Sequence, residues 1–579
     1  MGGWRMRARA LGLAALLAAG WTAADTSPLE PAGGGSHKAL AHAPHAMVAA
    51  AHPLAARAGL EVLERGGNAI DAMVATQLVL NLVEPSASGL GGGGFLLYYD
   101  AKAKQVYAYD GRETAPRGAT PSLFLDAAGK PLPFQAARVG GRSVGVPGTP
   151  RLLEIAHLRH GKLPWASLFA PAIALAERGF PVSPRFNRVV ATDRGLEKEP
   201  AAREYFFDAS GKPKAVGTIV RNPSYAATLR ALARDGADAF YTGAIARDIV
   251  EAVHSHRNPG TLSLEDLASY RVRTVAPLCR DYRARRLCGM PPSSSAGIAV
   301  LQVLGELERF DMAALSPDSI QAVHRLTEAE RLAFADRERY VADDRFVDVP
   351  VEGLLDPAYL AGRSMLISAA HSMGQAEPGS PAGAARAYAR DPYDEVMGTT
   401  HISIVDAEGN AVAMTASIES YYGSRILVDG FLLNNELTDF AFEPMHDGEP
   451  VANAVAPGKR PRSSMAPFLV FGRDGRFEMA IGSSGGSLII GYVLKALVAI
   501  LDRGMDPQSA IDLPNFDSRN GPTEIEGGTE LATMEPALKA LGHEVRAFEM
   551  TSGTQVVRRV RGGLEGAADP RREGVALGY

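Results

Sequence analysis

The stretch Gly398–Glu419 reads GTTHISIVDAEGNAVAMTASIE, and it decides the fold of this chain. Two strand-length runs, TTHISIV and AVAMTAS, flank the turn sequence AEGN, which predicts a β-hairpin. The preceding segment, Met373–Val396, is dense in Gly, Ala and Pro and has no periodic apolar face, which predicts a loop or linker. Strand FEMAIG and helix SLIIGYVLKALVAILD follow. The last third is therefore predicted to be a sheet-and-helix unit that the chain enters through a linker.

Thr399 stands where this linker meets the first strand, and this place suits one kind of chemistry. A threonine hydroxyl is a poor nucleophile without a base, but a threonine at a chain terminus carries its own α-amine. The ordinary pKa of an α-amine is about 7.7–8.0, so a useful fraction is neutral near pH 7. Such a terminus requires cleavage of the Gly398–Thr399 bond. By itself TTHIS is also an ordinary opening of a β-strand.

The first two thirds of the chain alternate between helical and strand patterns. AARAGLEVLERGG and NAIDAMVATQLVLNLV predict a helical pair with Asn68 as an N-cap. LGGGGFLLYYD and QVYAYDGRETAP predict two strands that bring a glycine-rich turn close to Arg112. Amphipathic stretches between 148 and 340 predict helices of the outer layers.

The N-terminus predicts export. Arg5, Arg7 and Arg9 precede an apolar run that ends at Gly20, followed by small residues up to Ala24. The apolar run is about half of the roughly 20 residues that span a bilayer, so we expect residues 1–24 to be a removed signal peptide rather than a membrane anchor. Residues 25–44 are expected to form a disordered lead-in. The mature protein should be periplasmic or secreted, with no stable membrane span.

Composition excludes other classes. The 579 residues are 46% hydrophobic and 22% charged, which indicates a globular chain. A net charge of -5, without basic blocks interleaved with aromatics, argues against nucleic acid as a partner. His37, His42, His45 and His52 lack helical ligand spacing, and three of them lie in a segment of disordered composition, so a solvated tail is expected there and no metal or cofactor is needed. Cys279 and Cys288 could face each other across a hairpin, so a disulfide and two separate thiols both stay open.

Two glycine-rich stretches suggest other enzyme classes. GLGGGG at Gly89–Gly94 matches a dinucleotide fingerprint in letters, but a helix precedes it and a strand follows, which is the wrong order. GSSGG at Gly482–Gly486 matches a nucleophile elbow with Ser484, and Asp512 or Asp517 and then His543 follow in the order of a serine hydrolase. The alternative is that these small residues expose N–H groups that bind an anion or oxyanion.

An ordered set of motifs resembles the γ-glutamyltransferase family, also called γ-glutamyltranspeptidase or glutathione hydrolase. The motifs span nearly the whole mature chain: LGGGGF at 90–95, GRETAP around Arg112, MPPSSSAG at 290–297, TTHISIVD from Thr399, LLNNELTDF at 432–440, PRSSM at 461–465 and GSSGGS at 482–487.

The resemblance implies the fold and the processing. It implies the α/β fold of N-terminal nucleophile hydrolases, a four-layer αββα sandwich with two largely antiparallel sheets between helical layers. Self-cleavage would yield a heterodimer of a large subunit, with its body at 45–398, and a small subunit at 399–579. Thr399 would attack γ-glutamyl amides such as glutathione and pass the acyl group to water, an amino acid or a peptide.

The resemblance also implies roles for individual residues. A γ-glutamyl group carries an α-carboxylate and an α-ammonium, which need a cationic fork and separate carboxylates. Arg112 would be the fork, helped by the hydroxyls of Ser463 and Ser464. The resemblance implies that the α-ammonium is bound by Glu419, Glu436 and Asp439. It implies that the oxyanion accepts from the N–H groups of Gly485 and Gly486, and that Ser417 orients the Thr399 hydroxyl.

Three departures from the family pattern bear on substrate choice. Glu419 stands where many members have Asn, Leu488 stands where Arg is common, and Ala441–Ala452 is shorter than a full-length lid. A short lid would leave the pocket more open to water or bulky substrates. A cephalosporin or glutaryl acylase that uses the same threonine is therefore the alternative function, with a Ser484 serine hydrolase behind it.

Overall fold

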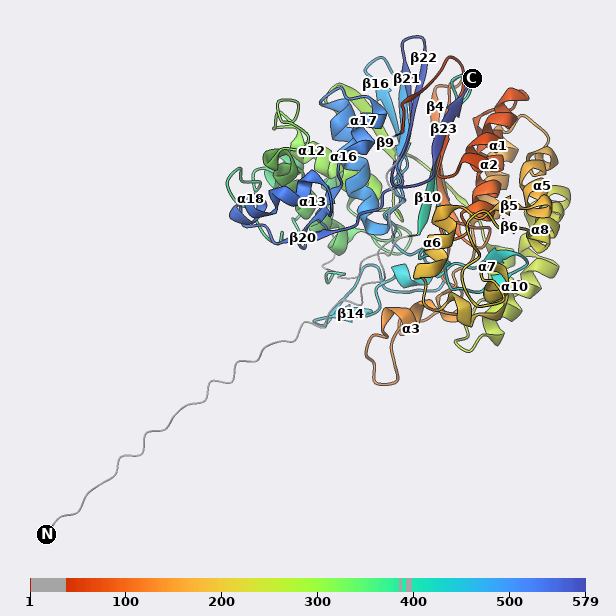
Figure 1. Cartoon of the computed structure of the whole chain (residues 1–579). Coiled ribbons are helices and arrows are strands. Elements are labelled where there is room, and N and C mark those ends of the chain that lie inside the picture. Colours follow the sequence, from red (N-terminus) through yellow and green to blue (C-terminus); the bar gives the residue numbers. More distant parts are fainter. Residues whose placement is uncertain (2–37, 385–387, 392–397) are drawn as a thin grey trace.

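A computed structural model gives the architecture (Figure 1). Beyond the initiator methionine, the residues it describes are 38–384, 388–391 and 398–579. The expected signal peptide, most of the lead-in and residues 385–387 and 392–396 of the linker therefore lie outside the described residues.

Two seven-stranded sheets stack face to face. The β10 sheet runs in the order β23 (Val575–Gly578), β2 (Met47–Ala50), β10 (Thr399–Val405), β11 (Ala411–Ser417), β3 (Gly93–Asp100), β4 (Gln105–Gly111) and β7 (Arg273–Val275). The β17 sheet runs in the order β1 (Ala41–Ala43), β22 (Gly563–Ala568), β21 (Gln555–Val560), β17 (Phe477–Gly482), β16 (Phe468–Gly472), β9 (Arg285–Gly289) and β8 (Leu278–Tyr282). Neighbouring strands within each sheet are antiparallel.

Helices cover the outer face of each sheet (Figure 1). One layer lies on the β10 sheet and includes α1 (Pro53–Glu64), α2 (Ala69–Val83), α4 (Thr149–His160), α5 (Ala170–Arg178), α8 (Pro223–Asp235) and α10 (Ala244–Ser255). The other lies on the β17 sheet and includes α12 (Ala296–Leu307), α13 (Ile320–Tyr340), α16 (Ile489–Leu501) and α17 (Pro507–Asp512). The predicted four-layer αββα sandwich is confirmed.

The predicted helical pair shows how local sequence starts these elements. Asn68 is the N-cap of α2: its side chain accepts from the Asp71 N–H at 3.1 Å, and the Asp71 carboxylate accepts from the Asn68 N–H at 3.0 Å. This capping box satisfies two N–H groups that the first turn would otherwise leave unpaired. All fifteen residues of α2 are buried, which places it against the β10 sheet.

Strand β10 lies in the middle of its sheet, and its side chains alternate between two environments. Ile402 and Ile404 pack into the helical layer, whereas Val405 packs between the sheets. His401 and Ser403 face the second sheet as well, since the Ser403 hydroxyl donates to the Gln555 carbonyl at 3.1 Å. The two-residue period therefore places Thr399 on the side between the sheets.

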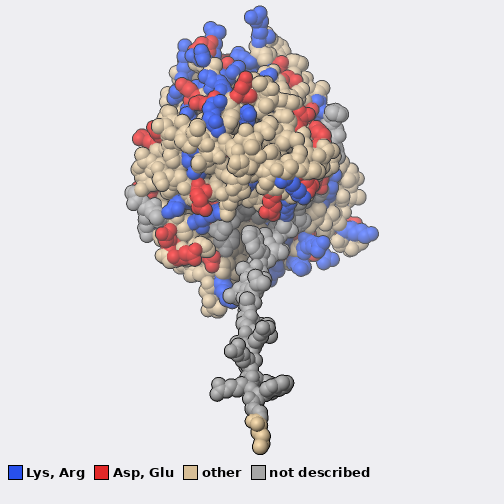
Figure 2. Space-filling view, turned by 90° about the vertical axis from the view of Figure 1, so that its left-hand side faces the viewer, with Lys and Arg blue, Asp and Glu red and all other residues tan. Residues whose placement is uncertain are grey.

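Five hairpin turns lie at the end of the sandwich opposite Thr399. They are the turns after β3, β8, β10, β16 and β21. Lys and Arg side chains gather at this upper end of the molecule (Figure 2). In the described part of the chain, no helix is both long and apolar enough to cross a bilayer.

Two expectations need correction. The lead-in was expected to be disordered up to residue 44, but Ala41–Ala43 form β1 and pair with β22. The three residues AHA are too few to show a strand pattern, and they are ordered by pairing with β22. His42 is therefore part of a sheet and does not lie in a solvated tail. His52 is the N-cap of α1, where its Nδ1 accepts from the Leu54 N–H at 3.2 Å.

The cysteines occupy the edge hairpin β8–β9. Cys279 and Cys288 are opposite each other in the register, and a disulfide joins them. The hairpin thus fixes the edge of the β17 sheet, and both side chains of the pair lie on one face.

Candidate active site

Thr399 and Ser417 face each other at the edge where the first hairpin opens. Thr399 begins β10, Ser417 ends β11, and the two are paired in register. The Thr399 hydroxyl lies 3.4 Å from the Ser417 hydroxyl, which donates to the Gly398 carbonyl at 2.7 Å. The Glu419 N–H donates to Ser417 Oγ at 2.8 Å and fixes it. Ser417 therefore contacts both sides of the Gly398–Thr399 peptide bond.

Gly398 has no room for a side chain. A Cβ atom there would lie 2.1 Å from the Glu419 carbonyl oxygen. The backbone of Glu419 has a φ of 73°, which turns the chain away from β11 just beyond Ser417. A glycine before Thr399 is thus a steric requirement as well as a feature of the linker.

A buried polar chain leads from Glu419 to the next segment. The Glu419 carboxylate accepts hydrogen bonds from the Ser420 hydroxyl and the Asn435 amide. The Asn435 N–H donates to the Ile418 carbonyl at 3.2 Å, which ties the segment that carries Glu436 to the end of β11. The motif around Asn435 is therefore held beside Thr399.

Arg112 follows the last residue of β4 and is 1% exposed. Its guanidinium forms ion pairs with Glu436 and Asp439, the two ends of the 3₁₀ turn η4 (Glu436–Asp439). It also donates to the carbonyls of Pro461 at 3.3 Å and Arg462 at 2.9 Å. A guanidinium has five N–H donors, so it can donate to several acceptors at once. These contacts offset the free-energy cost of burying its charge. The cationic fork and two of the expected ammonium-binding carboxylates are thus brought together.

Ser463 and Ser464 follow directly on the segment that accepts from Arg112. The Ser463 hydroxyl accepts from the Met465 N–H at 3.2 Å, and the Ser464 hydroxyl accepts from Arg337 at 2.8 Å. Both hydroxyls are buried.

Gly485 and Gly486 lie where β17 gives way to η5 (Gly486–Leu488) and α16. Their φ angles are 140° and 60°, which favour glycine at both positions. A Cβ at Gly485 would lie 2.5 Å from the ring of Tyr492. The turn is next to the β10 sheet, since a Cβ at Gly482 would meet the ring of His401 at 2.3 Å.

The segment around Ser484 has the strand–turn–helix order of a nucleophile elbow, but the described side chains around it lack the catalytic triad that a serine hydrolase needs. Ser484 Oγ has no hydrogen-bond partner among the described residues. His543 is engaged elsewhere, with Nδ1 2.7 Å from the Thr523 hydroxyl and Nε2 2.7 Å from His324 Nδ1. No base is therefore positioned to activate Ser484 in the part of the chain that the structure describes.

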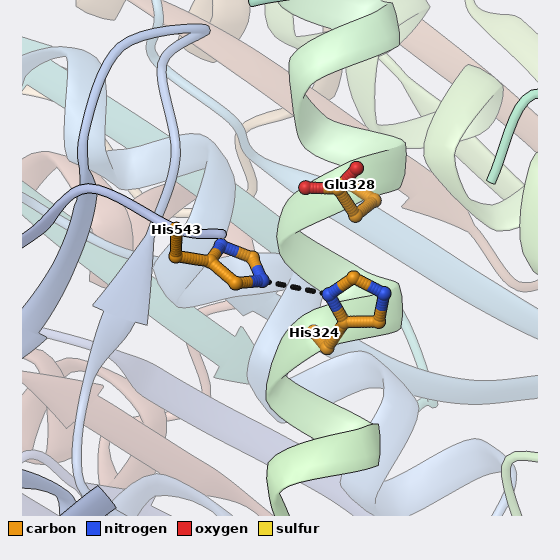
Figure 3. A group of neighbouring side chains, drawn as sticks. All are labelled: His324, Glu328 and His543. Atoms are coloured by element: carbon orange, nitrogen blue, oxygen red, sulfur yellow. Dashed lines mark hydrogen bonds between the residues drawn. The ribbon is translucent and has the colours of Figure 1, made fainter. Parts of the chain in front are cut away.

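His324, Glu328 and His543 form a buried cluster of metal-ligand type (Figure 3). A directed hydrogen-bond chain accounts for the imidazoles: Arg331 donates to Thr523, Thr523 to His543, His543 to His324, and His324 to the Ser368 carbonyl. The Arg331 donor and the carbonyl acceptor at the two ends set this direction. Glu328 accepts from the Ser372 hydroxyl and the Met373 N–H. The cluster thus fastens the start of the linker to α13.

Three contacts around Thr399 and the glycine-rich turn were not predicted from the sequence. The Arg572 guanidinium donates to the Thr399 carbonyl at 3.0 Å and pairs with Glu84 at 3.4 Å. Asn434 donates to the Gly91 carbonyl at 2.7 Å, so it joins the glycine-rich turn to the NNEL segment. The doubled Asn in NNELTDF could have drawn attention to Asn434, whereas nothing in DPRREG marks Arg572.

An αββα sandwich in which a threonine heads a central strand after a linker defines the class of N-terminal nucleophile hydrolases. The γ-glutamyltranspeptidase family model matches residues 55–579. The chain belongs to this family.

Individual relatives agree with the family match. The chain is 36% identical over 544 residues to the glutathione hydrolase proenzyme of Bacillus subtilis (strain 168), which covers 92% of this chain and 91% of the relative. It is 35% identical over 595 residues to that of Escherichia coli (strain K12), which covers 99% of both. It is also 36% identical over 541 residues to the acylase ACY 1 proenzyme of Pseudomonas sp. (strain SE83), which covers 92% of this chain and 93% of that one.

Solved structures similar to this chain include one named as a cephalosporin acylase and one named as a γ-glutamyltranspeptidase. The cephalosporin acylase from Bacillus halodurans superposes with a TM-score of 0.82 at 28% identity and covers 94% of this chain and 97% of that one. A γ-glutamyltranspeptidase chain from Helicobacter pylori superposes with a TM-score of 0.54 at 34% identity and covers 59% of this chain and 97% of that one.

Proposed function

We propose that this protein is a γ-glutamyl hydrolase and transferase that cuts itself before Thr399 and acts on glutathione and related γ-glutamyl compounds. The observation that carries the proposal is the continuous set of contacts from Thr399 through Ser417, Glu419 and Asn435 to the Arg112 ion pairs. It joins a candidate nucleophile to a buried cluster of charges of both signs, and a γ-glutamyl group demands groups of both signs.

The first step is the formation of the new terminus. The Thr399 hydroxyl attacks the carbonyl carbon of Gly398, the peptide bond breaks in an N-to-O shift, and water hydrolyses the resulting ester. The Ser417 hydroxyl already contacts that carbonyl oxygen at 2.7 Å and stabilises the charge that develops on it. The products are a large and a small subunit that stay together as a heterodimer.

In the mature enzyme, the α-amine of Thr399 takes the proton of its own hydroxyl as the oxygen attacks the γ-glutamyl amide. The N–H groups of Gly485 and Gly486 stabilise the tetrahedral oxyanion, and the amine then returns the proton to the leaving amine. Water or the amine of an acceptor attacks the acyl-enzyme and restores Thr399.

Arg112, Ser463 and Ser464 would bind the α-carboxylate, and Glu419, Glu436 and Asp439 the α-ammonium. Export would follow from residues 1–24, which places the enzyme in the periplasm or outside the cell. The short segment Ala441–Ala452 holds only the small hairpin β14 (Met445–His446) and β15 (Glu449–Pro450).

The acylase relatives favour a second candidate function, cleavage of glutaryl-type amides with the same nucleophile. A glutaryl group keeps the carboxylate of a γ-glutamyl group and lacks only its ammonium. Glu436 and Asp439 beside Arg112 favour the γ-glutamyl substrate, because carboxylates attract an ammonium and a glutaryl group has none.

Hydrolysis of γ-glutamyl-p-nitroanilide and glutaryl-p-nitroanilide by the purified enzyme separates the two functions. We expect kcat/KM for the γ-glutamyl compound to exceed that for the glutaryl compound at least tenfold. An Asp439→Asn variant should lose most of this preference, chiefly through a higher KM for the γ-glutamyl compound. A preference for the glutaryl compound would show that the protein is an acylase.

A further inference from the structure

Arg572 reaches the main chain of the candidate nucleophile from the far end of the sequence. It lies between β22 and β23, its side chain is fully buried, and its Nη1 donates to the Thr399 carbonyl at 3.0 Å. A buried guanidinium thus holds the main chain of the residue that would become the new terminus.

Glu84 supports this arginine. It is the C-cap of α2, and its carboxylate lies 3.4 Å from Arg572 Nη1 and 3.3 Å from Arg185 Nε. Because Thr400 follows Thr399 on the opposite face of β10, it points toward this carboxylate on the helical side of the sheet. The cluster of Glu84, Arg185 and Arg572, here called the buried triad, therefore braces the first two residues of β10.

The position of Arg572 has an electrostatic consequence once the chain is cut. The amine and the carbonyl of Thr399 belong to one residue, so the guanidinium would lie within about 6 Å of the new α-amine. A positive charge at that distance disfavours the ammonium form of the amine and favours the neutral form. The neutral form is the one that can accept the hydroxyl proton.

We propose that Arg572 is a positioning residue that fixes the Thr399 backbone and keeps its amine unprotonated, and that Glu84 orients Arg572 and moderates its charge. The inference rests on the proposed role of Thr399 as the nucleophile. It adds a cation to the catalytic environment that acts through the amine and does not touch substrate.

Other charged groups surround the buried triad, and the charge of Glu573 acts on both Glu84 and Arg185. Glu573 accepts from the Arg185 N–H at 2.9 Å, and Lys38 donates to the Arg572 carbonyl at 2.6 Å, so both face the backbone of the triad. Burial lowers the pKa of His52 to about 4, so this side chain is neutral in the working range. On the other side of Thr399, Glu419 is held by Ser420 and Asn435.

Glu84 itself titrates near neutrality. Burial raises its pKa to about 7, against the opposing effect of Arg572. When Glu84 is protonated, the charge of Arg572 is uncompensated and acts fully on the amine. Removal of the guanidinium should therefore raise the pKa of the amine over the whole range, whereas removal of the carboxylate should lower it above about pH 7, where the wild-type carboxylate is ionised.

The test is the acid limb of kcat/KM for γ-glutamyl-p-nitroanilide between pH 5 and pH 9, which reports essential groups of the free enzyme. It uses processed heterodimer, with cleavage before Thr399 verified by mass spectrometry. We expect Arg572→Gln to move the limb up by about one pH unit, Glu84→Gln to move it down, and Arg572→Lys to leave it near the wild-type position. Arg559→Gln, an exposed arginine at the hairpin end, is the matched control and should change nothing.

Opposite shifts of the first two variants support the proposal, and limbs that coincide with the wild type overturn it. If Arg572→Gln is not processed, Glu84→Gln carries the test, because it keeps the guanidinium. The two limbs are then compared above pH 7, where the wild-type Glu84 carboxylate is ionised: a downward shift supports the proposal, and an unchanged or upward limb overturns it. Thr399→Ala distinguishes the two levels. An active Thr399→Ala enzyme overturns the proposed function. If Thr399→Ala is inactive but the Arg572 and Glu84 variants keep the wild-type acid limb, only the role of Arg572 is overturned.

Discussion

At the scale of single residues, the site depends on glycines at positions where a larger side chain would overlap neighbouring atoms. Gly398 contacts the Glu419 carbonyl, Gly92 contacts the Ser417 carbonyl, and Gly485 contacts Tyr492 so closely that a Cβ would overlap each partner. These contacts bring backbone to within reach of Thr399 and of the expected oxyanion. These glycines lower the stability of the fold, because glycine raises the conformational entropy of the unfolded chain.

Gly485→Ala should therefore impair catalysis more than folding. Its Cβ would displace the turn against Tyr492 at a φ of 140°, and displacement of one oxyanion donor typically costs roughly 10²–10³ in kcat. Steady-state kinetics on the processed enzyme measures this. Gly504→Ala, at a φ of 68° with no atom within 4 Å, is the control for backbone strain alone. Equal effects of the two substitutions would contradict an oxyanion role.

The burial of Glu113 predicts that the stability of the protein depends on pH. It is fully buried beside Arg112, its carboxylate oxygens have no hydrogen-bond partner among the described residues, and burial raises its pKa to about 8. The pKa of this carboxyl in the unfolded chain is near 4.5. Between pH 4.5 and pH 8, Glu113 therefore keeps its proton in the folded state and releases it in the unfolded state. Its contribution to stability is thus full below about pH 4.5 and is lost as the pH rises toward 8.

Glu113→Gln should remove that dependence, because it replaces the protonated acid by a neutral group of the same shape. Thermal unfolding at pH 5 and pH 8 should show a smaller fall in Tm for the variant than for the wild type. Parallel falls would mean that Glu113 is ionised in the folded protein.

At the scale of elements, local patterns predicted most of what positions the site. The period-two run after Thr399 became β10, the turn at AEGN joined it to β11, and the Asn68 cap opened α2. These features depend on neighbours in sequence. Strand β1 was missed because its order comes from pairing with β22, more than 500 residues away, and not from its own side chains.

The β8–β9 hairpin provides a test at this scale. The Cys279–Cys288 disulfide closes a loop of sequence separation 9, for which chain entropy gives a stabilisation of roughly 2–3 kcal/mol. A Cys279→Ser, Cys288→Ser double variant should have a lower Tm and keep its activity at 25 °C, since β8 is the outermost strand of the β17 sheet. The wild type under reducing conditions is the matched comparison. An unchanged Tm would show that the bridge adds no stability.

At the scale of the whole molecule, the chain needs both of its expected subunits to build one site. Arg112 lies before the cleavage position and pairs with Glu436 and Asp439 after it, and Glu84 pairs with Arg572. The αββα order followed from the family resemblance, and the ion pairs of Arg112 with Glu436 and Asp439 join residues that lie in the quoted motifs. The contact between Arg572 and Thr399, 173 residues apart, was not predictable, because only the folded sandwich brings the C-terminal segment to β10.

The chemistry assigned to Thr399 requires that this residue become a chain end, because its amine then serves as the base. Mass spectrometry with N-terminal sequencing of active enzyme, compared with a Thr399→Ala variant, tests this most directly. The account predicts that the active protein contains a fragment of residues 399–579 beginning Thr-Thr-His-Ile, and that the variant stays uncut and inactive. Full activity from a chain with an intact bond between residues 398 and 399 would contradict it.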